Sequence, residues 1–183
     1  MRLKRMPWVV IALCIVLAPL SAESVSAVKF QLFSKSFTNG AGIPARHGCG
    51  PERDWKKPSL PLNWEGAPTG TQSFTILMYD LHPVAQNWVH WLVSDIPAGV
   101  TQLTQGASGL SMPPQAKEYK NTFGNKGYGA PCPPSGTHRY RIEIYALPTE
   151  SLSFNPQGKT GEVLSEMLAK RALAVARLEG IYP

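Results

Sequence analysis

The sequence lacks the short motifs that mark most recognisable catalytic sites. It contains no HExxH or CxxC zinc signature, no GxSxG nucleophile elbow, no Walker sequence and no dinucleotide-binding glycine fingerprint. Charged residues make up only 16% of the chain, and no run of five or more Lys or Arg residues occurs. These absences weaken the case for nucleic-acid binding and for the enzyme classes that depend on those motifs.

The sequence has no apolar run that reaches the length of about 20 residues needed to span a bilayer. Its N-terminal run, residues 8–18, follows three basic residues and is closed by Pro19. Small residues ending at Ala27 complete the pattern of a secretory signal peptide. We therefore expect residues 1–27 to be a signal peptide, cleaved near Ala27, and residues 28–183 to form one secreted or periplasmic domain. The alternative is an uncleaved membrane anchor.

Few cysteines and little net charge remain beyond residue 27. The 15 basic and 11 acidic residues left give a net charge of about +4, which favours anionic small molecules or surfaces only modestly. In an exported chain, Cys49 and Cys132 are expected to form one disulfide. That bond would close a loop of roughly 80 residues and contribute about 4 kcal/mol in the chain-entropy model. The alternative is two separate thiols.

Apolar patterning predicts a mainly β domain. Four segments have either a continuous apolar run or alternating apolar and polar residues, both typical of β-strands. One segment has apolar residues at the spacing of an α-helix. The strands are expected at residues 28–37, 73–81, 90–96 and 139–147, and the helix at residues 161–180, ended by Gly180. Strands that precede a helical segment favour an antiparallel β-sandwich with peripheral helices over a parallel α/β fold.

Polar side chains gather at the ends of these expected strands. They are Asp80, His82, His90 and His138. If the strands are neighbours, these side chains converge at one edge of a sheet, beside a loop rich in Gly and Pro. Backbone N–H groups in such a loop can hold an anion. A zinc site and ordinary buried histidines are the alternatives.

Several blocks of the sequence resemble the phosphatidylethanolamine-binding protein family, which includes the bacterial Raf kinase inhibitor-like proteins. "PSLPLNWEGAPTGTQSFTILMYD" and "HWLVSDIPAGVTQLTQGAS" are similar to its first two blocks. "NTFGNKGYGAPCPPSGTHRYRIEIYAL" and the closing "LAVARLEGIY" are similar to the last two, in the family's order. The resemblance implies two antiparallel sheets, a C-terminal helix, and a small preformed pocket for phosphate or the phosphoryl head groups of phospholipids or nucleotides.

The resemblance also implies which residues form that pocket. The ligand-binding residues would be Asp80, His90, His138 and Tyr140, with Gly129, Pro131 and Pro134 in the wall and His82 and Trp88 at the rim. The family's cysteine positions match Cys49 and Cys132. We expect both pocket histidines to donate N–H bonds to phosphoryl oxygens, and Asp80 to orient one of them. One departure stands out, because His82 replaces the second acid of the family's DPDxP pattern.

These residues favour a binding protein with no catalytic residues, no metal and no cofactor. The expected partner is a phosphoryl-containing small molecule or lipid head group, with a protein partner also possible and with no nucleic acid or stable membrane span. Two alternatives remain open. One is a protein-interaction module that inhibits a kinase or protease. The other is a metal-dependent hydrolase that uses Asp80, His82, His90 and His138.

Overall fold

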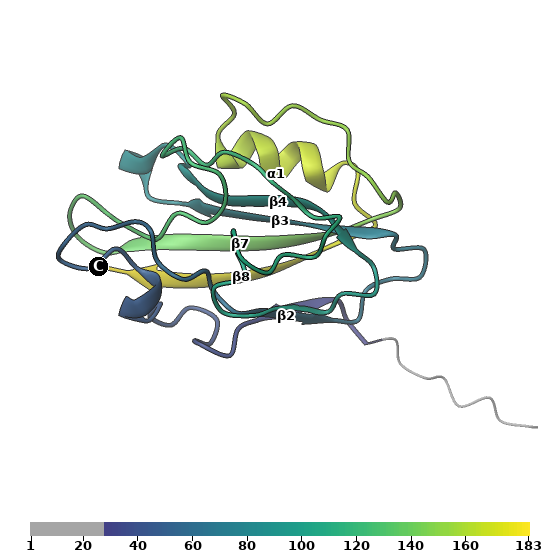
Figure 1. The fold of residues 1–183 in the computed structure, drawn as a ribbon, viewed down its shortest axis with the longest axis horizontal. Coiled ribbons are helices and arrows are strands. Elements are labelled where there is room, and N and C mark those ends of the chain that lie inside the picture. Colours follow the sequence, from purple (N-terminus) through teal and green to yellow (C-terminus); the bar gives the residue numbers. More distant parts are fainter. Residues whose placement is uncertain (1–27) are drawn as a thin grey trace, which may run out of the picture.

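The computed structural model describes residues 28–183 as two antiparallel β-sheets with one α-helix packed on the outside (Figure 1). The small sheet has the order β1-β2-β5 and the large sheet the order β6-β4-β3-β7-β8. The strands are β1 (Gln31–Phe33), β2 (Leu62–Glu65), β3 (Ser73–Asp80), β4 (Val89–Pro97), β5 (Gln102–Leu103), β6 (Lys117–Glu118), β7 (His138–Leu147) and β8 (Ala174–Tyr182). The helices are η1 (Ala45–His47), η2 (Pro83–Ala85) and α1 (Gly161–Ala169). The predicted fold class is confirmed.

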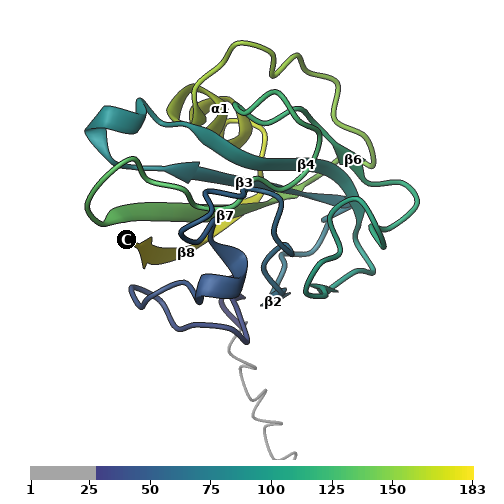
Figure 2. The same cartoon turned by 60° about the vertical axis from the view of Figure 1, so that its left-hand side comes forward.

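The large sheet is the middle layer, with α1 on one face and the small sheet on the other (Figures 1 and 2). Side chains alternate between these two faces along each strand. On β3, Phe74 and Ile76 pack toward the small sheet, whereas Leu77 and Tyr79 pack toward α1. Because β3 is covered on both faces, every one of its residues is buried. This explains why its sequence is a continuous apolar run that ends at an acid.

The C-terminal end differs from the prediction. The helix α1 stops at Ala169, and residues 170–173 form a turn. From Ala174 the chain continues as the strand β8, which pairs with β7 along its whole length, so the predicted helix is confirmed only up to Ala169. Gly180 therefore lies within a strand, and an added Cβ there would come within 2.7 Å of Phe37 and Ile43. The helical prediction was wrong because Ala176 and Leu178 also fit a period of two with Arg177 and Glu179, and pairing with β7 decides between the two patterns.

Other predicted elements need smaller corrections. The first strand is confined to Gln31–Phe33, although residues 28–37 were predicted. The strands predicted at residues 73–81, 90–96 and 139–147 are confirmed to within one residue at each end. Within the described residues, no helix is both long and apolar enough to cross a membrane. The predicted signal peptide lies outside the described residues.

Candidate functional site

Three strand ends bring the predicted polar residues together. Asp80 is the last residue of β3, His90 the second of β4 and His138 the first of β7. The register of β3 and β7 places Tyr140 opposite Asp80, on the face that packs toward the small sheet. These four side chains are no more than 3% exposed. With His82, they form what we call the imidazole cluster.

Asp80 fixes the ring of His138. The Nδ1–H of His138 donates to Oδ2 of Asp80 at 2.6 Å, and the backbone N–H of His82 donates to Oδ1 at 2.8 Å. Both carboxylate oxygens of Asp80 are therefore engaged by the protein. The other ring nitrogen of His138, Nε2, is buried and has no hydrogen-bond partner among residues 28–183.

Tyr140 presents a second polar atom without a partner. Its hydroxyl is buried and forms no hydrogen bond within the described part of the chain. Burial raises the pKa of Tyr140 far above its usual value, and the negative charge of Asp80 raises it further. The hydroxyl therefore keeps its proton and is available as a donor.

His90 has a different hydrogen-bonding state from His138. Its Nδ1–H donates to the carbonyl oxygen of Gly129 at 2.8 Å, and the Gly129 N–H donates back to the carbonyl oxygen of His90 at 2.8 Å. Burial lowers the pKa of His90 to about 4, so the ring is neutral near pH 7. Its Nε2 then carries a lone pair and accepts a hydrogen bond, rather than providing the N–H donor expected from the sequence.

His82 lies directly against the cluster although it is exposed. Its ring stacks on the ring of His138, with centroids 4.0 Å apart and an interplanar angle of 8°. The N–H of Val84 donates to Nδ1 of His82 at 3.3 Å, which leaves Nε2 as the protonated nitrogen of the neutral ring. The residue that departs from the family pattern therefore covers one face of the His138 ring.

The predicted wall residues occupy different positions. Gly129 is buried, and a Cβ there would lie 2.7 Å from the ring of Phe123, so only glycine fits without a shift. Pro131 is buried, and its carbonyl accepts from the Cys49 N–H at 2.9 Å. Pro134 is exposed. Trp88 is 37% exposed and packs edge-to-face on Phe123, which in turn contacts the ring of His90.

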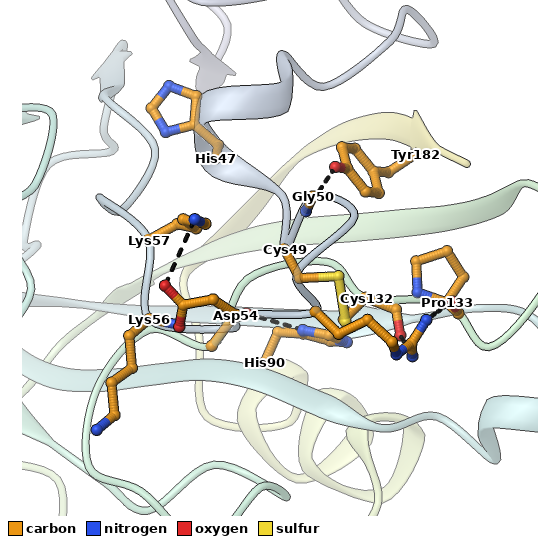
Figure 3. The surroundings of a disulfide bond; sticks show 12 residues. His47, Cys49, Gly50, Asp54, Lys56, Lys57, His90, Cys132, Pro133 and Tyr182 are labelled. Carbon is orange, nitrogen blue, oxygen red and sulfur yellow. Dashed lines mark hydrogen bonds and ion pairs between the residues drawn. A yellow bond between two sulfur atoms is a disulfide. The ribbon is translucent and has the colours of Figure 1, made fainter.

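A disulfide joins Cys49 to Cys132 and braces the loop before β7 (Figure 3). The two Cα atoms are 5.2 Å apart, and 83 positions separate the residues in sequence. The guanidinium of Arg53 reinforces the same loop, because it donates to the carbonyl oxygens of Cys132 and Pro133 at 3.3 and 3.1 Å. The predicted bridge is confirmed.

Sequence reasoning missed two contributors to this region. Phe123 contacts His90, Trp88 and Trp55 with its ring, and Arg53 secures the loop. Phe123 lies inside a matched family block, but a single aromatic carries no signal of its own. Arg53 acts through backbone carbonyls some 80 positions away, so no local pattern could have identified it.

The geometry does not favour the metal alternative. Among residues 28–183, no group of three or more His, Cys, Asp or Glu side chains is arranged to hold a metal ion. The ring nitrogen Nδ1 of His90 and that of His138 are already engaged with Gly129 and Asp80. The hydrolase hypothesis therefore gains no support from this part of the chain.

Comparison with known families gives a direct result. A family model described as "Phosphatidylethanolamine-binding protein" matches residues 33–183. The chain belongs to the phosphatidylethanolamine-binding protein family. This is the family predicted from the sequence blocks.

Individual relatives within the phosphatidylethanolamine-binding protein family cover most of the chain. A UPF0098 protein of Aquifex aeolicus is 36% identical over 161 residues, covering 87% of this chain and 91% of the relative. The UPF0098 protein YbcL of Escherichia coli is 34% identical over 168 residues, covering 87% and 90%. A Mycobacterium tuberculosis relative named as lipoprotein LppC is 33% identical over 162 residues, covering 86% and 74%.

A solved structure from the same family shows the same fold. The crystal structure of YbcL from E. coli, described as a member of the mammalian PEBP family, aligns with a TM-score of 0.74 and 32% sequence identity. The alignment covers 85% of this chain and 98% of YbcL. The chain therefore shares the fold of this relative.

Proposed function

We propose that the protein is an exported binding protein that holds a phosphoryl-type anion at the imidazole cluster. One observation carries the proposal. His138 Nε2 and Tyr140 Oη are both buried, both without a hydrogen-bond partner among residues 28–183, and both part of the same cluster. Each buried polar atom left unpaired costs about 1–3 kcal/mol. A ligand that bonds to both atoms would recover that free energy.

The protons available in the cluster favour one form of the ligand. With neutral rings, His90 and His138 both present a lone pair at Nε2, and Tyr140 supplies an O–H. A fully ionised phosphate needs donors and meets acceptors there. Binding therefore requires one proton more, carried either by the ligand as P–OH or by His138 as an imidazolium.

Asp80 favours the second of these alternatives, in which His138 carries the additional proton. Its carboxylate already accepts from His138 Nδ1 at 2.6 Å, so an imidazolium formed when the ligand binds would keep this hydrogen bond and direct its second N–H, at Nε2, to the anion. The imidazolium would donate from Nε2, and a charge-assisted hydrogen bond to an anion is stronger than a neutral one. Asp80 also repels a dianion, which favours a singly charged ligand. Affinity should therefore fall by up to about tenfold per pH unit on the alkaline side.

Export has independent support. Residues 1–27 have the signal-peptide pattern, and disulfides persist in oxidising compartments. The name of the M. tuberculosis relative as a lipoprotein is consistent with a location in the cell envelope. These observations support the proposal that the protein acts in the periplasm or outside the cell.

Calorimetric titration with inorganic phosphate and with phosphoethanolamine tests the proposal. We expect saturable binding to the wild-type protein, with net proton uptake detected by repeating the titration in buffers of different ionisation enthalpy. His138→Ala should abolish the heat. His47→Gln is the matched control, because His47 is buried but both of its ring nitrogens are bonded, to Pro58 and Ser36. Wild-type protein that shows no binding of either compound would refute the ligand assignment.

A further inference from the structure

We propose that a groove on the opposite face of the large sheet is a second binding site, for a small anionic molecule with an apolar or aromatic body. This helix-side groove encloses about 870 Å³ and lies between segments 85–89, 119–124 and 154–160 and the start of α1. Its volume lies within the range of about 300–1,000 Å³ that small-molecule sites occupy. None of the five residues of the imidazole cluster lines it, whereas Trp88, which was predicted at the rim of the phosphoryl pocket, does.

The groove has an apolar floor and an aromatic rim. Leu92 and Leu164 line it and are only 1% exposed. Tyr119 and Phe154 pack edge-to-face with centroids 5.3 Å apart, and both contribute to the lining. Trp88 lines the groove as well and remains 37% exposed, so part of its surface is open to a ligand. These surfaces suit a flat apolar body.

The charge at the groove has one sign. Lys120 and Lys159 line it, and no lining residue is an acid. Neither lysine forms an ion pair with an acid of residues 28–183. The neighbouring acid at the first turn of α1, Glu162, is already engaged, because it accepts from the Asn87 side chain at 3.1 Å. An anionic group is therefore the complement of this rim.

The backbone at the groove is held in an uncommon conformation. Gln86 and Asn87 both line it, and both have positive φ angles, 48° and 56°. Residues other than glycine rarely adopt this region, and such strain concentrates at ligand sites. The Gly161 N–H donates to the carbonyl oxygen of Asn87 at 2.7 Å, which ties the strained turn to the start of α1. The rim is therefore preformed.

A second hollow offers a built-in comparison. It encloses about 520 Å³, and its lining includes Trp55 and three lysines, of which Lys57 is paired with Asp54 at 3.4 Å and the others are Lys56 and Lys126. There the aromatic and the charge already engage each other, because Lys56 Nζ lies over the Trp55 ring at 5.3 Å. The carboxylate of Asp54 also lies beside the lysines of this hollow and adds a negative charge there (Figure 3). This hollow should bind the same ligand class more weakly, and it supplies the matched control.

The test uses 8-anilinonaphthalene-1-sulfonate, an anionic aromatic probe, with the purified folded protein. We expect one equivalent to bind, and the indole N–H resonance of Trp88 to shift in proton–nitrogen correlation spectra while that of Trp55 stays in place. The double variant Lys120→Gln, Lys159→Gln should weaken binding about tenfold. The control double variant Lys56→Gln, Lys126→Gln should leave it unchanged.

Two further experiments test the ligand class and test whether the groove binds independently of the imidazole cluster. The neutral analogue N-phenyl-1-naphthylamine should bind about tenfold more weakly than the sulfonate. Saturating phosphate and His138→Ala should not alter probe binding, so this result is separable from that for the imidazole cluster. Absence of binding, a shift at Trp55 in place of Trp88, equal effects of the two double variants, or equal affinity for the neutral analogue would each overturn the proposal.

Discussion

Two buried acids lie on opposite faces of the large sheet, and their surroundings differ in one decisive respect. On the face toward α1, Glu143 accepts from the hydroxyl of Tyr145 and from Arg177 Nε, the latter at 2.7 Å. On the other face, Asp80 accepts from His138 while the hydroxyl of Tyr140 is left without a partner. Both clusters combine an acid, a tyrosine and a nitrogen base.

This difference is our reason for proposing that one cluster is structural and the other binds a ligand. The Glu143 cluster, meaning Glu143, Tyr145 and Arg177, closes its hydrogen bonds internally and so contributes to stability alone. The imidazole cluster leaves two polar atoms open at a cost in stability, and natural proteins retain such costs where function needs them. Acid and tyrosine content therefore does not distinguish the two clusters, whereas the hydrogen bonding of their own side chains does. Two further buried side-chain atoms of residues 28–183, Trp64 Nε1 and Thr75 Oγ1, also have no partner, so an unpaired atom alone does not mark a site.

Removal of the disulfide should produce the largest change in the free energy of unfolding. The double variant Cys49→Ser, Cys132→Ser should lower the free energy of unfolding by about 4 kcal/mol, because the bridge closes a long loop of the unfolded chain. It should also weaken phosphate binding, because the bridged loop lies against His90 and leads into His138. Denaturant titration and calorimetry measure the two effects. Unchanged stability would show that the bridge does not constrain the unfolded chain.

The two acids provide the next comparison. Asp80→Asn and Glu143→Gln should each lower the free energy of unfolding by about 1.5–3 kcal/mol, because each replaces hydrogen bonds to a buried carboxylate with weaker neutral ones. Only Asp80→Asn should abolish the proton uptake that accompanies phosphate binding. The measurements are denaturant titration and calorimetry in two buffers. Loss of phosphate binding in Glu143→Gln would contradict the assignment of that cluster to structure.

The buried neutral histidine predicts acid sensitivity. The pKa of His90 is about 4 in the folded protein, below the ordinary value of 6.5 for the unfolded chain. Between these values the unfolded chain binds more protons, so stability is lost as the pH falls from about 6.5 to 4, by about 3 kcal/mol. Burial lowers the pKa of His47 too, and adds in the same direction. Denaturant titrations across this range should show the loss, and His90→Gln should reduce it.

The two tyrosines give the smallest but most discriminating change. Tyr140→Phe removes an unpartnered hydroxyl, so stability should stay the same or rise by up to about 1 kcal/mol, while phosphate affinity falls about tenfold. Tyr145→Phe should lower stability by about 1–3 kcal/mol, because Glu143 loses a donor, and should leave affinity unchanged. Thermal unfolding and calorimetry distinguish the pair. Equal destabilisation by both variants would remove the distinction between the clusters.

Much of the imidazole cluster could be predicted from the sequence. Strand periodicity located β3, β4 and β7, and the family blocks selected Asp80, His90, His138 and Tyr140 at their ends. The hydrogen-bonding state of His90 could not be predicted, because it depends on the carbonyl of Gly129, 39 positions away. For the same reason the stacking of His82 on His138 had no signal in the sequence.

The incorrect helix prediction and the missed groove also have physical causes. Residues 174–182 satisfied two periodicities, and only the partner strand β7 selected the extended one. The helix-side groove was not predicted, because its lining comes from four separated segments and its key property is the absence of acids. Neither feature produces a local motif.

The central claim is that His138 Nε2 and Tyr140 Oη bind a phosphoryl anion together with one proton. Long-range proton–nitrogen correlation spectra of the imidazole rings, recorded at neutral pH during a phosphate titration, test it most directly. We expect His138 Nε2 to move to the shift of a protonated, hydrogen-bonded nitrogen at saturation, while both nitrogens of His47 remain unchanged. An imidazole spectrum of His138 that does not respond to saturating phosphate would contradict it.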